Sequence, residues 1–180
     1  MHNPRPLFNS VKRALFLLLS GALPAIAQQK QMVKPLLDQP LRHASICQGG
    51  DGRWYLTGTS PASAPGAPAS AKPGEQDFQN NDGMEVWVSA DLKTWESLGQ
   101  VWSIQRDAPK SPKSAWQLER RINPDNPSGP FARGITAPQI HFLRETFFIA
   151  YSMNDQGTGL LRSTSGEAVG PYEDLGRITA

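Results

Sequence analysis

The sequence predicts an all-β protein built from a repeated four-stranded unit, and two observations lead to this prediction. Short runs of β-branched and aromatic residues alternate with turn residues along the chain, whereas apolar residues at helical spacing are nearly absent. One phrase also occurs twice, as WESLGQV beginning at Trp95 and as YEDLGRI beginning at Tyr172. Both combine an aromatic residue, Glu, Leu, Gly and a β-branched residue at the same offsets, so an internal repeat is expected.

The first 27 residues have the composition of a secretory signal peptide. Three basic residues precede an uncharged, mostly apolar run, ALFLLLSGALPAIA, which ends in an A-x-A cleavage site at Ala27. The alternative is an uncleaved membrane anchor, but the run is shorter than the roughly 20 residues that a spanning helix needs. We therefore expect residues 1–27 to be removed, Gln28 to become the N-terminus, and the protein to be secreted or periplasmic.

Charge and cysteine content restrict the function classes. The formal net charge is +2, and loss of the three cations of the leader leaves −1 for residues 28–180. This balance gives no reason to expect nucleic acid or, after leader cleavage, a membrane as a partner. Cys47 is the only cysteine, so no intramolecular disulfide forms. Its setting in Ser45-Ile46-Cys47 favours an inert thiol in a buried strand, and a catalytic thiol is the alternative.

In the first half of the chain, strand signals surround a Pro/Ala-rich insertion. The turn dipeptide Asp51-Gly52 precedes an aromatic and β-branched run at 53–60. The run at 84–90 alternates, which places Val86 and Val88 on one face and Trp87 on the other. The segment 60–76 is too rich in Pro, Ala, Ser and Gly to join a core, so we interpret it as a flexible insertion between two strands.

A long, proline-rich connection at 103–134 separates the two halves. One short helix is expected within it at 114–122, with Ser114 as the cap. Strands are then expected at 137–143, 146–152 and 158–164, the first two joined by a tight turn at Arg144-Glu145. Long ordered connections often line functional sites.

The two halves share one frame. When Ile46 is aligned with Ile140, three further pairs fall at corresponding places: Gly83 with Gly159, Ser89 with Ser163, and Leu98 with Leu175. Each copy then contains four short strands in a unit of about 45 residues, which is close to the length of one blade of a β-propeller.

Several phrases resemble glycoside hydrolase family 43, a family of five-bladed β-propellers. The matching phrases, in chain order, are DQPLRHASICQGGDGRWYLTGT, MEVWVSADLKTWESLG, RGITAPQIHFLRETFFIAYSM and GTGLLRSTSGEAVGPYEDLG. The resemblance implies two N-terminal blades, at about 38–102 and 135–180. It also implies a poly- or oligosaccharide partner, because members hydrolyse arabinan, xylan and related plant polysaccharides with inversion.

The resemblance assigns catalytic roles to positions where this chain has lost a carboxylate. The family's general base is an Asp within R-D-[PA]-S-I, and the matching RHASI has His43 there. The carboxylate that tunes the acid's pKa lies in W-A-P-[DE]-[IV], and the matching TAPQI has Gln139 there. The general-acid Glu corresponds to a position beyond Ala180. Inverting hydrolysis needs both an acid and a base, so we expect no hydrolysis, and either a residual polar role or no role for His43.

Two residues of the long connection are candidate sugar contacts. The ring of Trp116 could stack on a sugar and Arg133 could donate to its hydroxyls; loop packing and solvation are the alternative. No cofactor is required by this chemistry, no metal-ligand cluster is visible in the sequence, and calcium is implied only by the family resemblance.

Three functional hypotheses remain open. The chain is a secreted family 43-like glycosidase, a non-catalytic carbohydrate-binding module, or a truncated gene product without function. Each blade of a propeller buries its faces against its neighbours, so two isolated blades are expected to expose apolar faces and to self-associate.

Overall fold

The computed structural model of the protein describes residues 35–61, 78, 81–119, 134–153 and 156–179. All of them belong to one compact unit, 34–180. The predicted leader, most of the 60–76 insertion, and Arg133 lie outside the described residues. No described helix is long and apolar enough to span a bilayer.

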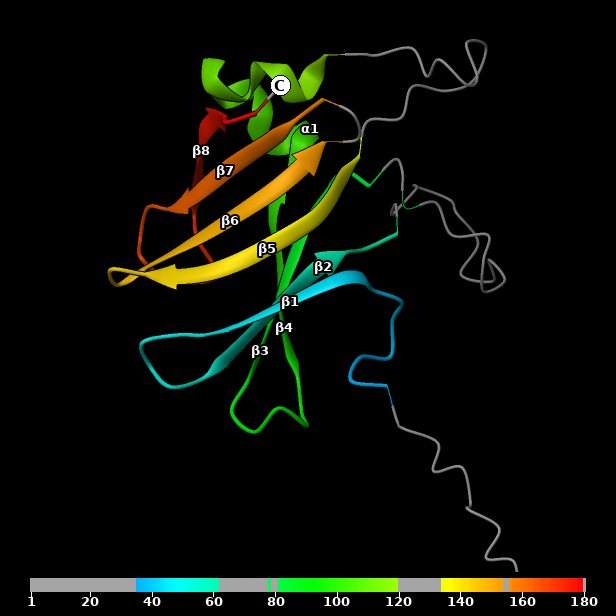
Figure 1. The fold of residues 1–180 in the computed structure, drawn as a ribbon, viewed down its shortest axis with the longest axis vertical. Coiled ribbons are helices and arrows are strands. Elements are labelled where there is room, and N and C mark those ends of the chain that lie inside the picture. Colours follow the sequence, from blue (N-terminus) through cyan, green and yellow to red (C-terminus); the bar gives the residue numbers. More distant parts are fainter. Residues whose placement is uncertain (1–34, 62–77, 79–80, 120–133, 154–155, 180) are drawn as a thin grey trace, which may run out of the picture. The chain divides into compact units, whose positions relative to one another are not determined.

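The described chain forms two four-stranded antiparallel sheets, which confirms the all-β prediction (Figure 1). Sheet one contains β1 to β4 and sheet two contains β5 to β8, each in simple sequential order. The strands of sheet one are Arg42–Gln48, Trp54–Thr59, Gly83–Ser89 and Glu96–Ser103. Those of sheet two are Ile135–Leu143, Thr146–Met153, Thr158–Ser163 and Tyr172–Arg177.

The core lies between the two sheets, where β5 packs beside β1 and β2. Sheet one contributes a buried column on β3, Met84, Val86 and Val88, and sheet two contributes Ile149 and others. Burial of each such side chain stabilises the fold by roughly 1.5–3 kcal/mol. Tyr55 and Phe147 meet edge to face across the interface, with ring centroids 4.6 Å apart.

The alternation predicted for 84–90 is visible in β3. Val86 and Val88 join the core between the sheets, while Trp87 lies on the opposite face in register with Leu56. Trp87 is nevertheless only 4% exposed. Both faces of β3 are therefore buried.

The helical content differs from the prediction of one helix at 114–122. A short α-helix, α1, spans Ile104–Asp107 and is followed by two 3₁₀ helices, η1 at Ala108–Lys110 and η2 at Pro112–Leu118. The cap of η2 is Ser111, whose hydroxyl accepts a hydrogen bond from the Lys113 N–H, and Ser114 is buried inside the helix. Pro112 explains the earlier start, because its fixed φ suits the first helical position.

Candidate functional site

The first strand of each sheet is interrupted by a bulge at the same place in the repeat. The pairing of β1 shifts between Arg42 and Ser45, and the pairing of β5 shifts between Thr136 and Gln139. Inside these bulges His43 has φ 52° and Ala137 has φ 47°. Because Ile46 aligns with Ile140, His43 and Ala137 are equivalent residues, so the two sheets repeat a backbone device as well as a sequence pattern.

The left-handed backbone at His43 restricts which side chains are tolerated there. Among residues with a side chain, Asn, Asp and His adopt this region several times more often than others. The sequence resemblance predicts an Asp at this position, where this chain has His. His43 belongs to the small group of side chains that suit the bulge.

A buried hydroxyl joins the two bulges. Thr59, at the end of β2, is 1% exposed. Its Oγ1 accepts a hydrogen bond from the Ala137 N–H at 2.8 Å and lies 3.2 Å from His43 Nδ1. A second contact nearby runs from the Ile140 N–H to Ser45 Oγ at 3.2 Å. The His43 ring is therefore held at the interface of the two sheets rather than projecting freely from one of them.

Gln139 lies two residues after Ala137 on β5, opposite Ala150 of β6, and is exposed. Its amide can donate and accept hydrogen bonds but carries no charge. It can therefore bind a sugar hydroxyl, but it cannot raise the pKa of a neighbouring acid as a carboxylate would.

Trp116 is placed in the core of the described chain. It is 7% exposed and stacks on Tyr151, with ring centroids 5.8 Å apart and an interplanar angle of 20°. The Arg177 guanidinium lies 5.9 Å from the same ring. These contacts correspond to the packing alternative rather than to an open sugar platform. Arg133, the other candidate of the long connection, lies outside the described residues.

A buried polar network beside Trp116 was not anticipated from the sequence. Trp102 Nε1 donates to Gln117 Oε1 at 3.1 Å, and Gln117 Nε2 donates to Asp174 Oδ2 at 2.6 Å. The Tyr151 hydroxyl donates to the same carboxylate at 3.0 Å. Burial, together with the adjacent Asp174, raises the pKa of Tyr151 above its usual value. Asp174 belongs to the repeated phrase YEDLGRI, but its partners lie far apart in sequence, so no local pattern marks it.

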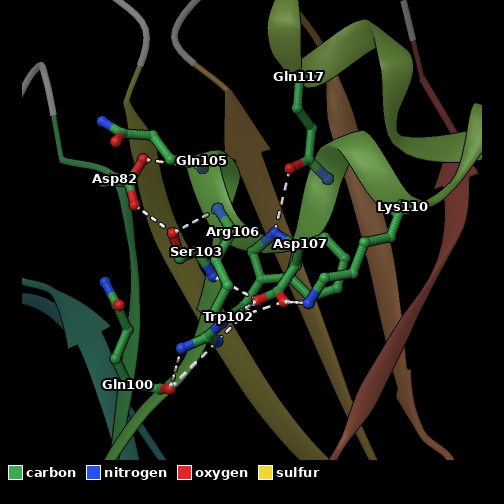
Figure 2. Close-up of polar contacts among 9 residues, drawn as sticks. All are labelled: Asp82, Gln100, Trp102, Ser103, Gln105, Arg106, Asp107, Lys110 and Gln117. Atoms are coloured by element: carbon green, nitrogen blue, oxygen red, sulfur yellow. Dashed lines mark hydrogen bonds and ion pairs between the residues drawn. The ribbon is translucent and has the colours of Figure 1, made fainter.

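A second polar cluster surrounds the start of α1 (Figure 2). Ser103 Oγ accepts a hydrogen bond from the Arg106 N–H at 3.1 Å and donates to Asp82. The carboxylate of Asp107 accepts from Arg106 at 2.7 Å, from Lys110 at 2.9 Å and from the Ser103 N–H at 3.0 Å. Burial acts to raise the pKa of Asp107, but these hydrogen bonds outweigh it and hold the pKa below its usual value.

The α1 cluster also lines a pocket of about 430 Å³, whose walls include Arg106, Asp107, Pro171 and Tyr172. The carboxylate in this wall is already saturated by two cations and a backbone N–H. We therefore interpret the cluster as a device that fixes the α1 turn onto β4.

The thiol of Cys47 is half-buried, and burial raises its pKa to about 11. A thiol with this pKa is almost entirely protonated at neutral pH, and the thiolate is the nucleophile. The structure thus favours the inert alternative for this residue.

Metal binding finds no support in the described part of the chain. No group of three or more His, Cys, Asp or Glu side chains within the described ranges is placed to hold an ion. Because calcium prefers several oxygen ligands, carboxylates above all, the described residues do not fit it.

Comparison with known proteins gives matches at the level of structure. No family model and no curated protein matches the chain. A β-xylosidase/α-arabinofuranosidase of family 43, CoXyl43 from a compost microbial metagenome, solved with xylotriose in a calcium-free form, is 16% identical; the match covers 78% of this chain and 36% of that one, with a TM-score of 0.50. The family 43 enzyme from Xanthomonas citri complexed with xylotriose is 14% identical, covering 79% and 34%, also with a TM-score of 0.50.

The protein belongs to the class of all-β folds built from sequential four-stranded antiparallel sheets, as in a partial propeller. More narrowly, its fold is similar to that of family 43 glycoside hydrolases, over a region that spans about a third of the length of the two structures described above.

Proposed function

We propose that the protein is a secreted, family 43-like protein of plant-polysaccharide metabolism that binds xylan- or arabinan-type oligosaccharides. We further propose that this chain by itself does not hydrolyse their O-glycosyl bonds. The observation that carries the proposal is the pair of bulges joined through Thr59, which holds an imidazole at the position that the family pattern gives to a catalytic base.

The choice of ligand is supported by the structural similarity and by the polar groups at the bulges. Both structures described above hold xylotriose. His43 and Gln139 present hydrogen-bonding groups of the kind that sugar hydroxyls accept from and donate to. Both side chains are exposed at the first strand of their sheet.

The absence of hydrolysis is proposed from the chemistry of the same two residues. An inverting glycosidase needs a carboxylic acid on one side of the bond and a base that activates water on the other. His43 and Gln139 replace the two carboxylates that the resemblance assigns to this region. An imidazole that gains a proton becomes a cation, which opposes the positive charge that develops on the sugar ring.

A second candidate function is hydrolysis by a longer protein that includes this chain. This candidate is favoured by the extent of the structural match, since the chain spans only about a third of the length of the compared glycosidases. In that case the remaining catalytic groups come from residues outside this sequence, and His43 still occupies the base position.

Binding and turnover should be measured separately on the chain beginning at Gln28. Calorimetric titration with xylotriose and arabinotriose is expected to show binding that weakens in His43→Ala. Release of reducing sugar from the same oligosaccharides is expected to stay at the level of a buffer blank. Sugar release that His43→Ala abolishes would overturn the non-hydrolytic proposal, and no binding to any oligosaccharide would overturn the binding proposal.

Secretion is tested independently of the sugar. Expression of all 180 residues in a host with a secretory pathway is expected to yield an exported product whose N-terminal residue is Gln28. A product retained with Met1 at its terminus contradicts this part of the proposal.

A further inference from the structure

The side chain of Thr59 makes hydrogen-bond contacts with both bulges. It lies at the end of β2, directly opposite Arg42 in the β1–β2 register. From there its hydroxyl oxygen reaches the Ala137 N–H of sheet two at 2.8 Å and the Nδ1 of His43 in sheet one at 3.2 Å. At 1% exposure the side chain is shielded from water, so its hydrogen bonds must be made with protein groups.

The direction of the Ala137 hydrogen bond is fixed by its groups, and that of the His43 contact is inferred from it. A backbone N–H only donates, so Ala137 occupies one lone pair of the Thr59 oxygen. The hydroxyl retains its proton and a second lone pair. A hydroxyl that accepts one hydrogen bond becomes a better donor, because successive dipoles polarise one another. The favoured chain therefore runs from the Ala137 N–H through the Thr59 O–H to the Nδ1 of His43.

From this arrangement we propose that Thr59 is a positioning residue for His43. It fixes the neutral imidazole with Nδ1 as acceptor and Nε2 as the protonated donor. The Nε2–H group is then available to a sugar oxygen, a role that rests on the proposed oligosaccharide binding. The tautomer itself follows from the contact with Thr59 and can be measured without a sugar.

The tautomer separates the two possible roles of His43. A general base needs a free lone pair on Nε2, which requires Nδ1–H to donate to Thr59. The chain of hydrogen bonds described above gives the opposite arrangement. Thr59 thus makes His43 a hydrogen-bond donor for binding and removes it as a base.

The structure offers a matched control on the same strand. Thr57 lies two residues before Thr59, is 0% exposed, and donates from Oγ1 to the Glu85 carbonyl at 2.7 Å. Thr57→Val and Thr59→Val both replace a buried hydroxyl with a methyl group. Only the second removes a contact to His43, and Thr59→Ser restores the hydroxyl.

The first measurement is the tautomer of His43 by long-range ¹⁵N–¹H NMR on the chain beginning at Gln28, at a pH where the imidazole is neutral. The sequence has one other histidine after the leader, His141, so His43→Gln assigns the signals. Wild type, Thr57→Val and Thr59→Ser are expected to show a single Nε2–H tautomer, and Thr59→Val a mixture. An Nδ1–H tautomer in wild type, or a single unchanged tautomer in Thr59→Val, overturns the proposal.

The second measurement is the affinity for xylotriose. Loss of an ordering hydrogen bond of ordinary strength is expected to weaken binding by about threefold to tenfold in Thr59→Val, with recovery in Thr59→Ser. Equal weakening in Thr57→Val contradicts a specific role for Thr59. If no variant and no wild-type sample binds xylotriose, the oligosaccharide proposal fails, while the tautomer result still decides the positioning role.

Discussion

Sheets one and two use the same backbone devices but bury different side chains on them. In sheet one the Gly99 N–H donates to Ser97 Oγ at 3.0 Å, and in sheet two the Gly176 N–H donates to Asp174 Oδ1 at 2.8 Å. Both glycines have positive φ, 82° and 105°. The repeated phrase therefore encodes one turn, made twice with two different oxygen acceptors.

The difference lies in what covers that turn. Ser97 is exposed, whereas Asp174 is 2% exposed and uses its second oxygen for Gln117 and Tyr151. The 3₁₀ helix η2 packs against β8 (Figure 1). Gln117 of η2 donates a hydrogen bond to Asp174 of β8. A local signal thus sets the backbone of each copy, and the neighbouring element decides whether the same position becomes a surface residue or a buried polar centre.

The largest difference in stability between variants of the two sheets is expected from the turn acceptors Asp174 and Ser97. Asp174→Ala should destabilise the fold by about 3 kcal/mol, because the buried Tyr151 hydroxyl loses its acceptor and Gln117 Nε2 keeps only its contact with the Tyr151 oxygen. Ser97→Ala should cost less than about 1 kcal/mol, since it removes one exposed hydrogen bond. Urea unfolding of both variants measures the difference, and equal losses would contradict the assigned burial.

Gly83 on β3 and Gly159 on β7 give the next contrast in stability. A Cβ on Gly83 would lie 2.1 Å from the Trp102 carbonyl oxygen, a backbone atom. On Gly159 it would lie 2.5 Å from the Tyr151 ring and 2.6 Å from Trp116, which are side chains. Overpacking typically costs about 1–3 kcal/mol, and backbone moves less readily.

Gly83→Ala is therefore expected to destabilise the fold by about 3 kcal/mol or more, and Gly159→Ala by about 1 kcal/mol. Thermal melts followed by near-UV circular dichroism report both stability and the environment of the aromatic rings. If Gly159→Ala destabilises the fold more than Gly83→Ala, the rings of Tyr151 and Trp116 move less readily than the backbone of Trp102 beside Gly83.

Substitutions at the two bulges are expected to have smaller effects, and to stabilise the fold rather than destabilise it. Ala137→Gly should stabilise the fold by roughly 0.5–1 kcal/mol, because relief of the left-handed strain exceeds the extra entropy of glycine in the unfolded chain. His43→Gly should gain less, since it also loses the contact with Thr59. Chemical denaturation tests both, and a gain from His43→Gly equal to that from Ala137→Gly would show that the Thr59 contact contributes nothing.

The smallest effect is expected at Asp107, beside α1 of the connection. Its folded pKa lies below its unfolded value, so it contributes stability above the unfolded pKa of about 3.9 and loses it as pH falls through the folded pKa. Asp107→Asn should therefore flatten the fall in stability below about pH 4, by less than about 0.5 kcal/mol because its cationic partners are exposed and screened. Melting temperatures of the wild type and Asp107→Asn as a function of pH, at low and moderate salt, measure this effect. If the fall in stability at acid pH is the same in both proteins, the ion pairs of Asp107 are contradicted.

Strand positions were readable from the sequence because they depend on local pattern. The observed bounds of β2, β3, β5, β6 and β7 lie within two residues of the predicted ranges. The 3₁₀ helix η2 begins before the predicted start at 114, because Ser111 supplies the cap and Pro112 suits the first helical position. The roles of Thr59 and Gln117 were not visible at all, since their partners lie 78 and 57 residues away along the chain.

By itself, the sequence determined the all-β class and the repeat of a four-stranded unit. These features follow from residue type, alternation and spacing, which act over a few neighbours. Only the tertiary structure decided that Trp116 packs in the core, that Asp174 is buried and Ser97 is not, and that Thr59 links the two bulges. Such contacts depend on which sheet faces lie against one another, and that arrangement results from burial summed over the whole chain rather than from any single segment.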